Sequence, residues 1–137
     1  MNAKTFLDTN VLIYLYSKDE PQKREAAAKA IEACRGPVII STQVINEFSN
    51  ILIRKFGLDA LDVLPAVEEL ADAFDIVTFD LETQREALRL KARYQFQYYD
   101  ALIVATAQEN GCDTLFSEDM QHGQKVERSL WIVSPFR

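Results

Sequence analysis

The sequence has few of the residues that most often mark a zinc site, a disulfide framework or a nucleophile triad. It contains one histidine, His122, and two cysteines, Cys34 and Cys112, which stand far apart and form no CxxC pair. Zinc-site spacing is therefore absent, and a Ser-His-Asp triad or a histidine-rich metal site would have to use His122 itself. We expect free thiols and a cytoplasmic protein, because disulfides are rare in reducing compartments.

Long apolar runs and an excess of positive charge are also missing. The longest apolar runs fall well short of the roughly 20 residues that cross a bilayer, and the N-terminus has no signal-peptide core. We therefore expect no membrane segment. The formal net charge is -6, from 21 acidic and 15 basic residues. This balance argues against nucleic-acid binding through a broad basic face, but not against nucleic acid held through bound metal ions.

What is present is the composition of a soluble globular protein, with 48% hydrophobic and 26% charged residues in 137. A chain of this length can bury a sizeable core without disulfides or structural zinc. No repeat, low-complexity stretch or Pro/Gly-rich linker interrupts it. We therefore predict a single domain over residues 1–137.

Short apolar strands alternate with helical segments along the chain. We expect strands at residues 4–7, 38–40, 76–79, 114–116 and 130–133. We expect helical segments at 11–16, 22–34, from Ser41 onward, after Asp59 with Pro65 restarting a helix to about 74, at 80–93 and at 98–110. This order predicts an α/β sandwich with a mostly parallel central sheet, in which ligands bind beyond the carboxyl ends of the strands.

Four carboxylates stand where such a sheet would bring them together. Asp8 follows the first strand, Glu47 lies on the helix after the second, Asp100 begins an almost wholly apolar helix, and Asp119 follows the strand at 114–116. Taken singly, each has an ordinary structural explanation: a helix cap, an ion pair, a first-turn acid and a turn former. In a parallel sheet, however, all four would open onto one crevice.

A bare cluster of carboxylates is unfavourable, because two like charges about 4 Å apart cost on the order of 4 kcal/mol at an effective dielectric of 20. Divalent cations remove this problem, and magnesium and manganese prefer all-oxygen ligands. Two such ions about 3.5–4 Å apart form a clamp for phosphodiester hydrolysis. That chemistry needs neither a histidine nor a serine nucleophile.

Four motifs resemble those of the PIN domain, and specifically of the VapC-like toxin ribonucleases of bacterial toxin–antitoxin pairs. They are FLDTNVL at 6–12, NEF at 46–48, YDALIVATA at 99–107 and LFSEDM at 115–120. They occur in the family's order across nearly the whole chain. The resemblance implies a PIN-like α/β/α sandwich whose acidic quartet, Asp8, Glu47, Asp100 and Asp119, is catalytic and binds metal.

The resemblance also implies that Thr9, Asn10 and Ser117 orient the metal-binding residues from behind them. It implies a Mg²⁺-dependent endoribonuclease, with Mn²⁺ as the alternative ion. It further implies an RNA substrate, a cognate antitoxin protein and a homodimer. The RNA target and the cleavage site do not follow from the motifs.

Two other functions compete with this interpretation. A phosphatase of the haloacid-dehalogenase type also has an aspartate after its first strand, but it places a second aspartate two residues later, where this chain has Asn10. A non-catalytic acidic pocket that binds metal or a basic tail is the other alternative. Basic and aromatic residues between Arg85 and Tyr99 could contact RNA, although a solvated helix face followed by core aromatics is the stronger interpretation of that segment.

Overall fold

The computed structural model describes residues 3–137, and within them six strands form one sheet. The strands are β1 (Thr5–Leu7), β2 (Val38–Ser41), β3 (Asp75–Val77), β4 (Thr114–Phe116), β5 (Lys125–Val126) and β6 (Leu130–Val133). Their spatial order is β3-β2-β1-β4-β6-β5, and all neighbours pair in parallel except β5 with β6. The predicted α/β class with a mostly parallel sheet is thus confirmed.

Strand β5 was not predicted from the sequence. It has two residues, of which only Val126 is buried, and it pairs antiparallel with β6. So short an element leaves no alternation of apolar and polar residues to detect. It forms because the chain reverses after Val126 and β5 then pairs with β6, which follows it directly along the chain.

Six helices connect the strands within residues 3–137. They are α1 (Thr9–Tyr16), α2 (Pro21–Glu32), α3 (Thr42–Arg54), α4 (Ala60–Ala73), α5 (Leu81–Tyr94) and α6 (Tyr98–Glu109). Side-chain caps fix three of their starts. Asp8 caps α1, Ser41 caps α3 through the amide of Val44, and Asp80 forms a reciprocal capping box with Thr83 on α5. Such caps are each worth about 0.5–2 kcal/mol.

Pro65 does not restart a helix, and this prediction was wrong. It lies inside the continuous helix α4. A proline there removes the amide that would bond to the carbonyl of Leu61. Leu61 itself is 81% exposed. Packing of Val63, Ala66 and Leu70 against the core holds the helix together across the missing bond.

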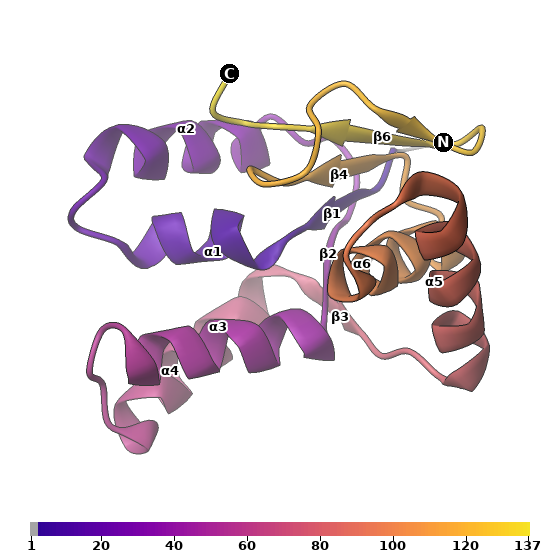
Figure 1. Cartoon of the computed structure of the whole chain (residues 1–137). Helices are drawn as coiled ribbons and strands as arrows, with labels where there is room; N and C mark the ends of the chain where they lie inside the picture. The colour runs from indigo at the N-terminus through magenta and orange to yellow at the C-terminus, as the bar shows by residue number, and fades with distance from the viewer. Residues whose placement is uncertain (1–2) are drawn as a thin grey trace.

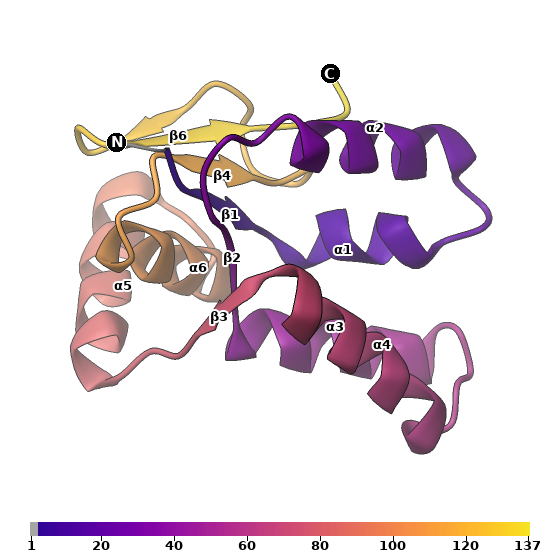
Figure 2. The same cartoon turned by 180° about the vertical axis from the view of Figure 1, so that it is seen from behind.

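The helices form two groups about the sheet. Figures 1 and 2 show α5 and α6 together on one side of the strands and α1–α4 on the other, in both views. Helices α1 and α3 follow the carboxyl ends of β1 and β2 directly. The carboxyl edge of the sheet is therefore bounded by helices on both sides.

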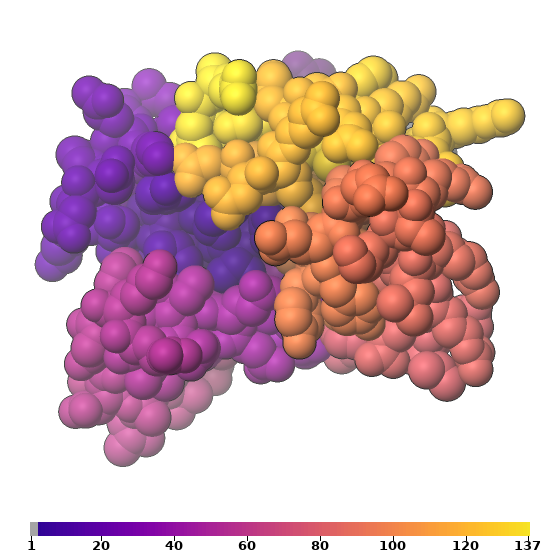
Figure 3. Space-filling view, viewed as in Figure 1, coloured from indigo at the N-terminus to yellow at the C-terminus, as the bar shows by residue number. Residues whose placement is uncertain are grey.

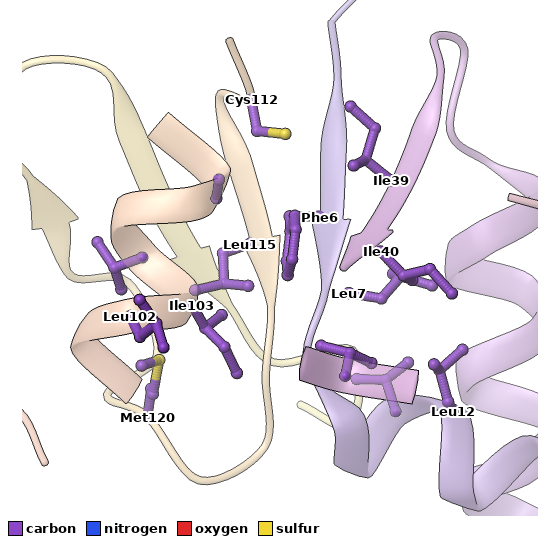
Figure 4. Packing of buried hydrophobic residues seen from close by; sticks show 14 of the residues in the cluster. Phe6, Leu7, Leu12, Ile39, Ile40, Leu102, Ile103, Cys112, Leu115 and Met120 are labelled. Atoms are coloured by element: carbon purple, nitrogen blue, oxygen red, sulfur yellow. The ribbon is translucent and has the colours of Figure 1, made fainter. Parts of the chain in front are cut away.

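The core lies on both faces of the central strand β1. Figure 4 shows Phe6 on the side of Ile103 from α6, and Leu7 on the opposite side with Ile40 and Leu12. All five side chains are at most 1% exposed. Because alternate residues of a strand point to opposite faces, the next residue, Asp8, is anchored by a rigid double-sided core. No helix within residues 3–137 is long and apolar enough to span a membrane.

Candidate active site

Asp8, Glu47, Asp100 and Asp119 all line one cleft of about 580 Å³ at the carboxyl edge of the sheet. They come from four different parts of the chain: the end of β1, helix α3, the first turn of α6 and the loop after β4. Figure 3 shows the indigo N-terminal segment set back between the magenta α3–α4 region, the orange start of α6 and the yellow-orange segment after β4. The juxtaposition expected from the strand order is present.

Asp8 is the deepest of the four carboxylates, with only 6% of the residue exposed. One carboxylate oxygen accepts a hydrogen bond from the backbone amide of Thr9 at 2.7 Å, and the other accepts one from the Ser117 hydroxyl at 2.8 Å. Burial raises the pKa of Asp8 from 3.8 to about 6 against these two bonds, and the charges of Asp100 and Glu47 raise it further. Desolvation therefore outweighs the hydrogen bonds.

Glu47 and Asp100 face each other from α3 and α6 and are half-buried. Burial is the main cause that raises the pKa of each, and a neighbouring carboxylate adds to it: Asp100 for Glu47, and Asp119 for Asp100. Glu47 accepts a hydrogen bond from Gln43, one turn earlier in α3, at 2.9 Å. Within residues 3–137 no hydrogen-bond donor reaches the Asp100 side chain.

The three polar residues predicted to support the site have different contacts. Ser117 is fully buried and binds Asp8. Asn10 donates to Asp119 at 3.1 Å and accepts from the backbone amide of Glu118 at 3.3 Å. Thr9 contacts Asp8 through its backbone, while its buried hydroxyl has no hydrogen-bond partner within residues 3–137. Ser117 and Asn10 therefore link the loop after β4 to the start of α1.

A second network behind this link was not predicted from the sequence. The Tyr14 hydroxyl donates to one carboxylate oxygen of Glu118 at 2.6 Å, and Lys23 pairs with the other oxygen. Lys23 also donates to the Tyr14 hydroxyl at 3.1 Å and lies over its ring. Adjacency of Glu118 to Asp119 was the one signal available. Lys23 is 95 positions away and gave none.

The cleft suits a hard divalent cation. The groups that could bind a cation are carboxylate and hydroxyl oxygens. Neighbouring carboxylates repel one another and so raise the pKa values of Asp8 and Asp100, and a bound cation would cancel this repulsion. Among residues 3–137 no three Asp, Glu, His or Cys side chains approach closely enough to form a closed set of ligands around one ion. Magnesium commonly binds through one or two carboxylates and fills its remaining positions with water and phosphate oxygens.

Three of the four basic residues suggested for RNA contact are paired with acids, and the fourth, Lys91, donates to the backbone carbonyl of Phe96 at 3.1 Å. Arg85 bonds to Glu82 at 2.9 Å, Arg89 bonds to Glu86 at the same distance, and Arg93 bonds to Glu127 at 2.8 Å. Their exposed positions on α5 make them an ordinary solvated helix face. The basic part of the RNA-contact interpretation therefore gains no support from the structure.

Histidine and the thiols take no part in the cleft. His122 accepts a hydrogen bond at Nδ1 from the backbone amide of Ser134 at 2.9 Å. Cys112 is buried, Cys34 is partly buried, and both are free. Chemistry at this site therefore depends on carboxylates.

Comparisons with known proteins agree with the fold. The PIN domain family matches residues 5–125. The fold is similar to a toxin–antitoxin complex from Klebsiella pneumoniae, at 23% identity over 96% of this chain and 97% of the other, with a TM-score of 0.73.

Two further solved structures share the fold. Mycobacterium tuberculosis VapC20, a sarcin-ricin loop cleaving toxin, is 19% identical over 81% of this chain and 86% of its own, with a TM-score of 0.67. VapBC2 from Rickettsia felis, bound to a DNA fragment from its promoter, is 15% identical over 96% and 98%, with a TM-score of 0.70. No curated protein matches the sequence. Because the family match covers most of its length, the chain belongs to the PIN domain family.

Proposed function

We propose that this protein is a divalent-metal-dependent endoribonuclease and the toxin of a toxin–antitoxin pair. The observation that carries the proposal is the meeting of Asp8, Glu47, Asp100 and Asp119 in one cleft from four separate segments. Like charges gathered in this way, one of them almost completely buried, have a chemical use if cations bind between them. Mg²⁺ or Mn²⁺ would supply Lewis acidity toward water and the phosphate of the substrate.

The chain's own residues would fix the geometry of that reaction. Asp8 is held from both sides by Thr9 and Ser117, so its carboxylate has one orientation. Asn10 holds the exposed Asp119 through one hydrogen bond. Positioning of this kind removes the cost of ordering the groups during the reaction.

An RNA substrate and the toxin role are supported by the solved structures with the same fold. One of them is named as a toxin that cleaves the sarcin-ricin loop, and others are toxin–antitoxin complexes. By extension we propose a cognate antitoxin as the protein partner and a homodimer as the assembly. We also propose that the protein acts in the cytoplasm.

The phosphatase alternative has little support in the geometry. It needs an acid two residues after Asp8, and Asn10 at that position is bonded to Asp119 and to the loop after β4. A non-catalytic acidic pocket would share every contact described above. The two functions are distinguished by whether the purified protein cleaves RNA.

Cleavage of RNA by the antitoxin-free protein tests the proposal. We expect single-stranded or loop RNA to be cut with Mg²⁺ or Mn²⁺ and left intact with a chelator. Asp100→Asn should abolish cutting, whereas Asp72→Asn, which removes an equal charge from the exposed face of α4, should not. No cleavage across varied RNAs would favour the binding protein, and phosphate release from small phosphomonoesters would favour the phosphatase.

A further inference from the structure

A second hollow, of about 650 Å³, lies beside the acidic cleft and shares Glu47 with it. It lies between α3, α6 and the segment after β3, and its lining includes Gln43, Asn46, Asn50, Phe79 and Tyr99. A volume of this size is typical of small-ligand sites. The proposed function leaves this hollow without a role.

One wall of the hollow is a stripe of amide side chains. Three amide residues and one carboxylate share one face of α3 at helical spacing: Gln43, Asn46, Asn50 and Glu47. Asn46 and Asn50 are exposed, and within residues 3–137 neither side chain makes a hydrogen bond. Each therefore presents an unused donor and an unused acceptor to whatever enters.

Gln43 connects this wall to the catalytic carboxylates. It is only 7% exposed, and its Nε2 donates to Glu47 at 2.9 Å and to the backbone carbonyl of Tyr99 at 3.4 Å. Its Oε1 is buried, lies beside the hollow and has no donor within residues 3–137. A buried acceptor without a partner is costly, so a ligand N–H that reached it after a small side-chain movement would be favoured.

The opposite wall is aromatic. Tyr99 is 66% exposed, although it is flanked by the buried Leu102 one turn later in α6. Phe79, from the segment between β3 and α5, is partly buried on the same hollow. An exposed ring opposite amide groups is the arrangement that stacks an unpaired nucleobase and hydrogen-bonds its edge.

We propose that this hollow binds one unpaired base of the RNA substrate, next to the phosphate that is cut, and sets the base preference of cleavage. The proposal rests on the proposed function. No lysine or arginine lines the hollow, so it offers no positive charge to a phosphate, and the shared Glu47 shows that it adjoins the acidic cleft. Reading bases through neutral amides also explains how a chain with a net charge of -6 can select RNA without a basic face.

The test is cleavage of a single-stranded RNA pool randomised around one cut site, with Mg²⁺. We expect the wild type to prefer particular bases at one position next to the cut. Asn50→Ala and Asn46→Ala should lower cleavage of the preferred sequence by roughly 5- to 100-fold and flatten that preference. Tyr99→Ala should lower cleavage of all sequences, and Tyr99→Phe should recover most of that loss because the stacking ring is retained.

A matched control and a second measurement separate the possible failures. Gln22→Ala removes an exposed amide from α2, which does not line the hollow, and should keep the wild-type base preference. A wild type that cuts nothing overturns the proposed function. A wild type that cuts, with unchanged preference in the Asn46 and Asn50 variants and undiminished cleavage by Tyr99→Ala, overturns the base site alone. If Tyr99→Ala instead changes the mass in solution, and Asn46→Ala and Asn50→Ala leave the preference intact, a second copy of the chain occupies the hollow, and the base site is wrong.

Discussion

The two walls of the acidic cleft are built differently. On one wall, Asp8 and Asp119 are each held by a donor from a distant segment, Ser117 and Asn10 respectively. On the other wall, Glu47 is held only from within its own helix, and Asp100 has no donor within residues 3–137. The first wall is therefore ordered by the protein, whereas the second needs a cation to be compensated.

Order and charge compensation are separate properties of this site. The bonds from Ser117 and Thr9 fix where Asp8 lies, yet its pKa is still raised to about 6 because burial is the larger effect. The hydrogen bonds therefore fix the orientation of Asp8, but they do not offset the cost of burying its charge. The ionised forms of Asp8, Glu47 and Asp100 therefore remain unfavourable in the absence of metal, because burial raises the pKa of each.

The largest expected effect is the loss of RNA cleavage when a carboxylate of the cleft is replaced, compared with replacement of the residue that orients it. Asp100→Asn and Asp8→Asn should each lower RNA cleavage by roughly 100-fold or more, because several kcal/mol of transition-state stabilisation depend on bound metal. Ser117→Ala should lower it by about 10- to 100-fold, since it only orients Asp8. Steady-state cleavage of one defined RNA measures all three. Equal losses in all three variants would mean that orientation and ligation cannot be separated at this site.

The sequence predicted the parts of this arrangement that depend on local pattern. Asp8 after a strand and Ser41 at a helix start were readable because apolar runs and capping residues are short-range signals. The side of the sheet on which the acids meet followed from the parallel order of the strands. Those are the features that position the four carboxylates.

Two of the features that escaped prediction depend on tertiary contacts. Glu118 is held by Lys23 and Tyr14, and no spacing rule links residues so far apart. The continuity of α4 across Pro65 depends on packing against the core, which overrides the local signal. A sequence therefore indicates where a carboxylate lies more readily than what holds it there.

Metal should stabilise the folded protein, and the second wall should account for much of the effect. Because Mg²⁺ binds the folded state preferentially, a concentration about 100 times its Kd would add roughly 2.7 kcal/mol, or several degrees in melting temperature. Asp100→Asn should raise the metal-free melting temperature slightly and reduce the magnesium-dependent increase. Thermal melts with and without Mg²⁺ measure both quantities. A large metal-free loss in Asp100→Asn would instead make Asp100 a structural residue of the α6 start.

The metal-free protein should become more stable as the pH falls from 7 toward 5. Asp8, with a pKa of about 6, takes up a proton in the folded state before it does so unfolded at 3.8, and Glu47 and Asp100 shift in the same direction. Protonation between pH 7 and 5 therefore favours folding, by about half of the ~3 kcal/mol that the whole pKa shift of Asp8 represents. Below about pH 4.5, the lowered pKa values of Asp80 and Glu118 act in the opposite direction.

Melting temperatures between pH 5 and 8 in a chelator check this expectation. Asp8→Asn is the informative variant, because it keeps the shape of the side chain and removes the titration. Its melting temperature should exceed that of the wild type at pH 8 and approach it at pH 5. Parallel pH profiles for the two proteins would show that Asp8 is not the group responsible.

The smallest expected effect lies behind the ordered wall, where Lys23 and Tyr14 hold Glu118. Glu118→Gln keeps a hydrogen-bond acceptor for Tyr14 but loses the charge that pairs with Lys23. The pair is partly exposed, at 36% and 25% of the two side chains, so water already screens much of its attraction. Cleavage should therefore fall by no more than about fivefold.

Because Glu118 adjoins Asp119, the Glu118→Gln variant should need more Mg²⁺ for half-maximal cleavage, while its rate at saturating Mg²⁺ stays nearly unchanged. A fall in the saturated rate alone would mean that Glu118 takes part in the reaction, and the first wall would then extend one residue further than its hydrogen bonds indicate.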